Sequence, residues 1–234
     1  MQRQRIEHEP AYVLHARPFG DTSLLLEVLT LQHGRCGLIA KGARAPKSRK
    51  RALLQVLQPL LLSWRESGEL GTLTAVEAAS APTMLAGEPL FCAWYANELL
   101  MRLLQRRDAQ PQLFGAYACL LPRLGDDAEA GLRAFECALL DALGYGLTLP
   151  DTLTAAASYR YHPQEGFSPA APGDSPSVCY CGTSLIALRD DALQEAQQYL
   201  DARRLLRSAL RPLLGERPLE TAQLLRALRE VSTL

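Results

Sequence analysis

The sequence changes character near residue 80, and this change restricts the fold to a β module followed by helices. Before it, apolar runs of strand length are separated by turns that contain Gly20, Gly34 and Gly68. The runs are Tyr12–Arg17, Ser23–Thr30, Arg35–Ala40, Ala52–Trp64 and Leu70–Ala78. Short strands at this spacing predict a small barrel or sandwich. Periodicity alone would also allow helices in the leucine-rich runs, but the turn residues favour strands.

Beyond Pro82 the apolar residues recur at helical spacing. The expected helices are Leu90–Arg107, Pro111–Leu124, Ala128–Leu143, Asp190–Gln198, Asp201–Leu214 and Pro218–Leu234. Residues 145–182 hold five of the fifteen prolines and show little periodicity, which predicts a long irregular insert. We therefore expect an α+β protein with a five-stranded barrel over residues 1–80. An all-helical domain over residues 81–234 would follow and would carry the insert.

All three lysines of the chain fall within Lys41–Arg51, which we call the basic segment. Its six cations, which no carboxylate accompanies, are Lys41, Arg44, Lys47, Arg49, Lys50 and Arg51. Residues 1–51 carry ten Lys/Arg against four Asp/Glu, a net +6, and residues 52–234 carry fifteen against twenty-one, a net −6. Because such cations neutralise backbone phosphates and release counterions, the segment predicts DNA binding, and Arg35 would extend the site. The simpler alternative is a solvated loop without a partner.

Three aromatic residues of the β module could provide stacking surfaces for bases in such a site. They are Tyr12, Phe19 and Trp64. Base stacking on aromatic side chains is a common mode of single-strand binding on small barrels. Each ring taken singly is more typical of a buried core, because aromatic side chains bury large apolar areas.

Signatures of catalysis are weak. The sequence has no phosphate-binding loop, dinucleotide fingerprint or nucleophile elbow. A hydrolase that uses His15 or His162 would lack a nucleophile–base constellation, so we do not expect an enzyme or a cofactor. Cys179 and Cys181 form the only close cysteine pair, and with His162 they would give three metal ligands at most. No run approaches a membrane span or a signal peptide, and a cytoplasmic protein is expected.

Several motifs resemble one family. At the N-terminus these are Tyr12–Ser23 with its Arg-Pro-Phe-Gly-Asp turn, Thr30-x-x-x-Gly34, and Gly37–Arg44 followed by Lys47-Ser48. Further along are the helix end at Leu139–Gly146, Arg211-x-x-x-Gly215 and Pro218-Leu219. In this order they resemble the recombination mediator family RecO. The resemblance covers most of the chain and is most specific at the N-terminus.

The resemblance implies an OB-fold barrel, a helical C-terminal domain and a nucleoid-associated DNA repair protein. It implies binding of single- and double-stranded DNA and annealing of complementary strands. It also implies cooperation with RecR, docking of the acidic tail of single-strand-binding protein, and loading of RecA. Two departures stand out. Many relatives carry four zinc cysteines in the insert, whereas this chain keeps Cys179 and Cys181, so we expect no zinc. Glu220-Thr-Ala222 stands where the family usually has Ser-Arg after Leu219.

An acidic tail with an apolar end requires a receptor that combines a hydrophobic pocket with arginines. Two predicted helices carry arginine clusters, and the candidate tail-binding residues are Arg102, Arg106, Arg203, Arg207 and Arg211. The last three share one face at i, i+4, i+8. The alternative is a solvated face paired locally with Asp201 or Glu195. A rival function for the whole chain is a protein-interaction adaptor whose basic segment binds an acidic partner.

Overall fold

The structure is a computed structural model that describes residues 4–66, 68–224 and 227. The chain divides into two compact units, Met1–Leu121 and Pro122–Leu234, which are described separately below. No helix among the described residues is long and apolar enough to span a membrane. The expected domain boundary after residue 80 stays a prediction. It coincides with the end of the last barrel strand, and the first compact unit continues beyond it.

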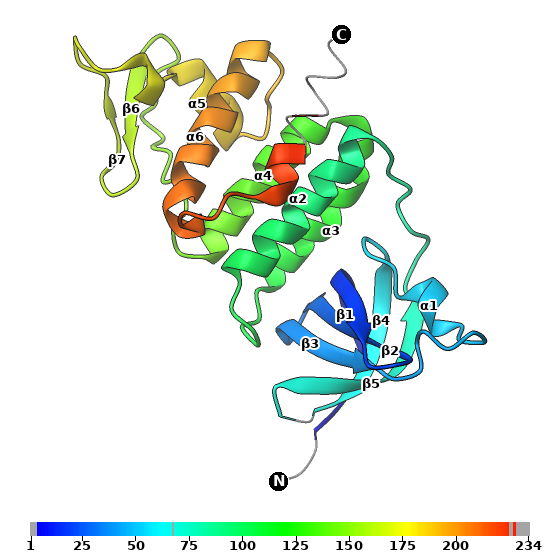
Figure 1. The fold of residues 1–234 in the computed structure, drawn as a ribbon. Coiled ribbons are helices and arrows are strands. Elements are labelled where there is room, and N and C mark those ends of the chain that lie inside the picture. Colours follow the sequence, from blue (N-terminus) through cyan, green and yellow to red (C-terminus); the bar gives the residue numbers. More distant parts are fainter. Residues whose placement is uncertain (1–3, 67, 225–226, 228–234) are drawn as a thin grey trace. The chain divides into compact units, whose positions relative to one another are not determined.

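The first unit opens with a closed five-stranded barrel, seen in blue and cyan in Figure 1. Its strands are β1 (Arg5–Phe19), β2 (Ser23–Thr30), β3 (Gly34–Ala40), β4 (Pro59–Arg65) and β5 (Leu70–Ala78). Their order around the barrel is β1-β2-β3-β5-β4, with β3 and β5 parallel and the other neighbouring strands antiparallel. This is the arrangement of an OB-fold, so the predicted fold class is confirmed.

Alternating apolar residues fill the barrel. Val13, Leu26, Leu38 and Leu62 are each 0% exposed and belong to one buried cluster. Because side chains of a strand alternate between faces, the residues between them point outward. Closure removes free strand edges, so inward packing and complete strand pairing stabilise the same structure.

A bulge in β1 changes which residues point outward. Val13 pairs with Val28 and His15 with Glu27, so Leu14 is an extra residue in β1. Before the bulge Val13 points into the core, and after it Ala16 packs against the core instead. The extra residue reverses the alternation along the rest of the strand. As a consequence, Arg17 and Phe19 lie on the outer face.

Two helices complete the first unit, α2 (Glu88–Leu103) and α3 (Pro111–Asp126), whose last residues belong to the second unit. Pro at the start of α2 and Glu88 in its first turn favour helix initiation there. Tyr12 on the outer face of β1 packs edge-on against Tyr117 of α3, with ring centroids 5.0 Å apart. The amide of Asn97 donates to the Leu14 carbonyl at 3.0 Å and accepts from the Tyr117 hydroxyl at 2.6 Å.

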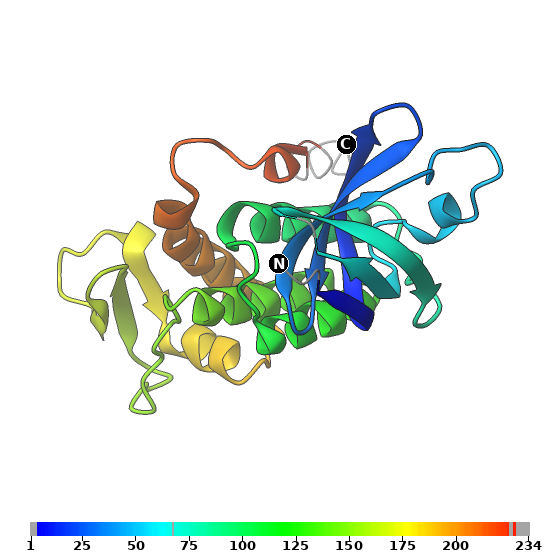
Figure 2. The same ribbon diagram turned by 90° about the horizontal axis from the view of Figure 1, so that it is seen from below.

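The second unit contains α4 (Ala128–Ala142), α5 (Gly182–Arg189), α6 (Ala196–Leu214) and a small antiparallel sheet. The sheet has the order β7-β6-β8, from β6 (Ser158–His162), β7 (Gly166–Pro169) and β8 (Cys179–Cys181), with the 3-10 turn η1 (Pro176–Val178) before β8. In both ribbon views β6–β8 lie beside α6 (Figures 1 and 2). Asp127 caps α4, and a capping box of Glu195 and Gln198 begins α6.

The structure corrects three expectations. Ala52–Trp64 is not one strand, because the short helix α1 (Lys50–Leu53) precedes β4 at Pro59, whose ring fixes an extended start. The insert is not irregular but holds the small sheet, whose strands are too short to give a periodic signal. The expected helix Asp190–Gln198 is wrong, since α5 ends before it and α6 begins at Ala196. Of Pro218–Leu234, residues 220–224 and 227 are helical, and the remainder of the expected helix lies outside the described residues.

Candidate nucleic-acid interface

The basic segment is fixed to the barrel rather than hanging free. Ala43 is completely buried and belongs to the barrel core. The backbone N–H of Arg44 donates to the carbonyl of Thr22 at 2.7 Å, and its guanidinium donates to the carbonyl of Gly20 at 3.2 Å. These bonds join the segment to the β1–β2 turn, where Gly20 has a positive φ of 58° that glycine adopts without strain.

All six cations of the basic segment are accessible, with Lys50 half-buried and the other five exposed. Within the described residues, none of the six forms an ion pair with a carboxylate. The segment therefore presents an ordered and unneutralised positive surface, which is the form of charge that phosphate contacts require.

The strand register places two further residues beside this surface. Phe19 pairs with Ser23 of β2, and Leu24 pairs with Ala40 of β3, so the next residues along are Ser23 and Lys41. Arg17 lies one outward position before Phe19 and is exposed, and it forms no ion pair with a carboxylate in the described part of the chain. Sequence reasoning missed Arg17. The hairpin turn that follows it is the signal that could have placed it near the basic segment.

Arg35 lies elsewhere and is not free. It stands near the start of β3, whereas the basic segment follows the end of that strand, about 17–20 Å away at the usual rise per residue. Its guanidinium pairs with Glu27 at 3.4 Å, and burial lowers the pKa of Arg35. Arg106 also pairs with Glu27, and the Arg107 N–H donates to the Arg35 carbonyl at 3.0 Å. The structure therefore places Arg35 in a contact that holds the segment after α2 against β3.

This contact depends on Gly34. A Cβ at this position would overlap the Asp108 backbone, and the φ of Gly34 is 64°. Only glycine permits the close approach. A small depression opens nearby, and its lining includes Trp64, Gly71 and Arg106. Its carboxylates and arginines are mixed, so it does not offer a positive surface comparable with the basic segment.

The aromatic candidates separate by burial. Tyr12 and Trp64 are 6% and 2% exposed and belong to the packed interior. Trp64 also meets the His33 ring edge-on at 5.4 Å. Phe19 is 42% exposed and is thus the one of the three that a ligand could reach.

The candidate tail-binding arginines are divided between the two units. Arg102 pairs with Glu98 one helical turn away at 3.7 Å, and Arg106 pairs with Glu27, both within the first unit. In the second unit Arg203 makes two hydrogen bonds to Glu129, at 3.0 and 2.7 Å. Arg207 and Arg211, one turn apart on α6, are exposed.

The residues around Cys179 and Cys181 determine whether this cysteine pair could bind a metal. Cys179 and Cys181 flank the buried Tyr180 on β8, and the residues paired with them on β6 are Arg160 and Ser158. The described residues include no group of three or more His, Cys, Asp or Glu that could hold a metal. Two thiols that face a cation and a hydroxyl do not fit a four-coordinate zinc site. The absence of zinc from the protein stays a prediction.

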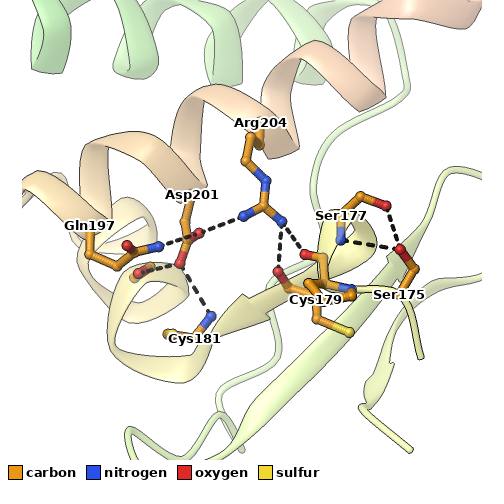
Figure 3. Close-up of polar contacts among 9 residues, drawn as sticks. Ser175, Ser177, Cys179, Cys181, Gln197, Asp201 and Arg204 are labelled. Carbon is orange, nitrogen blue, oxygen red and sulfur yellow. Dashed lines mark hydrogen bonds and ion pairs between the residues drawn. The ribbon is translucent and has the colours of Figure 1, made fainter. Parts of the chain in front are cut away.

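A polar network occupies this region instead (Figure 3). Asp201 of α6 accepts from the Ser184 hydroxyl at 2.8 Å, from the Gln197 amide at 3.0 Å and from the Cys181 N–H at 3.3 Å. Arg204 donates to the Cys179 carbonyl at 2.9 Å, and its guanidinium lies 5.1 Å from the centre of the Tyr180 ring. The network connects the backbone of β8 to side chains of α6.

Comparison with known proteins identifies the family. The family model for the N-terminal part of recombination protein O matches residues 1–82, and the model for its C-terminal part matches residues 85–170. The DNA repair protein RecO of Dechloromonas aromatica is 39% identical over 98% of this chain and 99% of its own length. The chain belongs to the RecO family. The RecO proteins of Methylococcus capsulatus and Nitrosococcus oceani are 42% and 43% identical, and each alignment covers at least 94% of either chain. The family supports a role in DNA repair and confirms the predicted resemblance.

Proposed function

We propose that this protein is a recombination mediator that binds single- and double-stranded DNA and anneals complementary strands. In this proposal it acts without a covalent reaction, at the nucleoid in the cytoplasm. The observation that carries it is the basic segment, in which six accessible cations, none of them paired with a carboxylate of the described residues, are fixed to an OB-fold barrel. Family membership supports the DNA repair role.

Annealing requires two polyanions to approach each other. Phosphate contacts from Lys41, Arg44 and the cations of Lys47–Arg51 would lower that repulsion by replacing mobile counterions. Because such contacts go to phosphates, they carry no sequence information. A protein that works on any gapped or broken DNA needs this tolerance, and the structure offers charge rather than a groove-reading helix at this site.

We further propose that the protein acts with RecR and with single-strand-binding protein to load RecA. The acidic tail of single-strand-binding protein remains assigned to Arg102, Arg106, Arg203, Arg207 and Arg211. Among these, Arg207 and Arg211 are the strongest candidates, because Arg106 and Arg203 already bind carboxylates. Titration of a labelled acidic tail peptide with Arg207→Ala/Arg211→Ala should show weaker binding than with Arg102→Ala. Equal affinities would remove α6 from this assignment.

The rival function, an adaptor whose basic segment binds an acidic protein, makes a different prediction for naked DNA. Labelled oligonucleotides separate the two by fluorescence anisotropy at low salt, because the adaptor would leave the anisotropy unchanged. The salt dependence of binding gives a second test. DNA binding by cation clusters depends steeply on salt, and this dependence can be measured directly.

The deciding experiment measures annealing of complementary oligonucleotides, bare and coated with single-strand-binding protein. The full-length protein should accelerate both reactions, and a variant with Lys47, Arg49, Lys50 and Arg51 changed to Ala should not. The matched control is Arg207→Ala/Arg211→Ala, which removes exposed cations of the second unit and should still anneal bare strands. Normal annealing of bare strands by the basic-segment variant would refute the proposed function.

A further inference from the structure

We infer that Phe19 is a stacking platform for one unpaired nucleobase and that Arg17 holds the adjoining phosphate. The inference rests on the proposed DNA binding and deepens it, because it names the form of DNA that the barrel distinguishes. Phosphate contacts of the basic segment serve single strands and duplexes alike. A base-stacking residue would add affinity for unpaired strands only.

The pairing of β1 with β2 and of β2 with β3 places Phe19 near Lys41. Phe19 pairs with Ser23, and the neighbouring Leu24–Ala40 pair is the last of β3, so Lys41 follows directly in the turn after that strand. Paired residues of antiparallel strands point to the same face. At a strand spacing of about 4.8 Å, the backbones of Phe19 and Lys41 are about 10 Å apart across the sheet. An apolar ring and two flanking cations, Arg17 and Lys41, thus share one outer surface.

The next row of the same face is apolar. Arg17 pairs with Leu25 of β2, and Leu25 pairs with Ile39 of β3. Leu25 is 8% exposed and Ile39 is half-buried. Because Leu25 is buried, the half-buried Ile39 is the residue of this pair that could give the sugar or base edge an apolar contact beside Phe19.

The remaining outer face of these strands is already occupied. Further along β1, Tyr12 packs on Phe114 and Tyr117 of α3. Further along β2, Glu27 is buried against Arg35 and Arg106. Helices and arginines of the protein cover those parts, so the end that carries Phe19 is the open part of the face.

The exposure of Phe19 supports the inference independently of the strand register. The backbone around it is fixed, because Arg44 bonds to both Gly20 and Thr22 in the turn that follows. Nevertheless the ring is 42% exposed, although Ala16 and Leu24 nearby pack against the core. An ordered, solvent-facing aromatic beside cations that no described carboxylate neutralises is the arrangement that binds single-stranded nucleic acid by stacking.

Duplex DNA cannot use this platform, because its bases are paired and stacked inside the helix. Phe19→Ala should therefore weaken binding to a single-stranded oligothymidine about five- to 150-fold, which corresponds to the stacking range of 1–3 kcal/mol per base. Binding to a duplex of equal length should change less than about twofold. Phe19→Tyr keeps an aromatic face and should retain the single-strand affinity.

The test measures anisotropy with both ligands at one salt concentration, with Met84→Ala as the control for loss of another exposed apolar side chain. As a second readout, Phe19→Trp should show fluorescence quenching by oligothymidine beyond that of the unmodified protein, and no extra quenching by an abasic strand. An equal loss for single strand and duplex, or no loss at all, would overturn the inference. Either result leaves the proposed function standing if the basic-segment variant still loses both ligands.

Discussion

Neutralising the basic segment gives the sharpest test of how this protein holds DNA. The perturbation is the fourfold change Lys47→Ala, Arg49→Ala, Lys50→Ala and Arg51→Ala, which leaves Lys41 and Arg44 in place. Arg44 is kept because it bonds to the β1–β2 turn. Within the described residues the four changed side chains form no ion pair with a carboxylate, so their removal should not leave a buried charge without its partner.

The magnitude follows from the number of free cations. If all six contact duplex phosphates, the logarithm of the affinity should fall with the logarithm of salt concentration with a slope of about −5.4, at about 0.9 per contact. The duplex affinity should then fall about 2,000-fold between roughly 50 mM and roughly 200 mM salt. With two contacts left, the slope should be about −1.8 and the same change in salt should cost only about 12-fold.

Single strands give an internal check. Each phosphate contact contributes about 0.7 to the slope on a single strand, so the expected slopes are about −4.2 and about −1.4. The assay is fluorescence anisotropy with labelled single- and double-stranded oligonucleotides over a series of salt concentrations. Thermal unfolding of the variant should match that of the unmodified protein, because the changed residues are exposed or half-buried.

Parallel salt lines for the variant and the unmodified protein would refute this reasoning. Such a result would mean that the four cations make no phosphate contacts, whatever their exposure. The Arg207→Ala/Arg211→Ala control should keep the full slope. A smaller salt dependence in the control would indicate that α6 makes the DNA contacts.

Three further predictions concern stability. Asn97→Ala removes the bonds of the Asn97 amide to the Leu14 carbonyl and to the buried Tyr117 hydroxyl, and should lower the free energy of unfolding by about 2–5 kcal/mol in urea titrations; a change below about 1 kcal/mol would show that water replaces the amide. Asp127→Ala should cost about 1 kcal/mol through loss of the α4 cap, whereas Asp127→Asn keeps most of it. Burial alone would raise the pKa of Asp127, but hydrogen bonds to its carboxylate outweigh this and lower the pKa. The stabilising contribution of the Asp127 cap is therefore present above about pH 4 and is lost as the pH falls further. A cap contribution that stays constant down to about pH 2 would contradict this direction of the pKa shift. Asp201→Ala should destabilise the protein by about 3–5 kcal/mol while a chelator leaves Tm unchanged, and a chelator-sensitive Tm would show that a metal contributes after all.

Turn chemistry and charge were sufficient to predict the barrel and its basic segment. Glycine-containing turns separated the strands correctly at Gly20 and Gly34, and the charge asymmetry did not depend on any fold. The small sheet of the insert was not predictable in the same way. Strands β7 and β8 are four and three residues long, too short for alternation to be distinguished from loop sequence.

The site was predicted less completely than the fold. Exposure of Lys47–Arg51 followed from composition, but the pairing of Arg35 with Glu27 depends on strand register and on the approach of residue 106. Sequence spacing does not encode either relation. Arg17 was missed for the related reason that the β1 bulge, which turns it outward, leaves no mark in the residue pattern.

The extra residue at Leu14 divides β1 into two parts whose outer faces have different surroundings. On one side of it β1 gives Tyr12 to a helical layer, and on the other it gives Arg17 and Phe19 to the solvent. Deleting Leu14 would remove the bulge and leave Phe19 on the outer face, because Val13 and His15 already oppose consecutive residues of β2. Deleting one residue between the bulge and Phe19 would instead place Phe19 opposite the inward-facing Leu24 and direct the aromatic ring into the barrel. The length of this short stretch of β1 therefore determines whether the proposed DNA-facing surface has its aromatic residue.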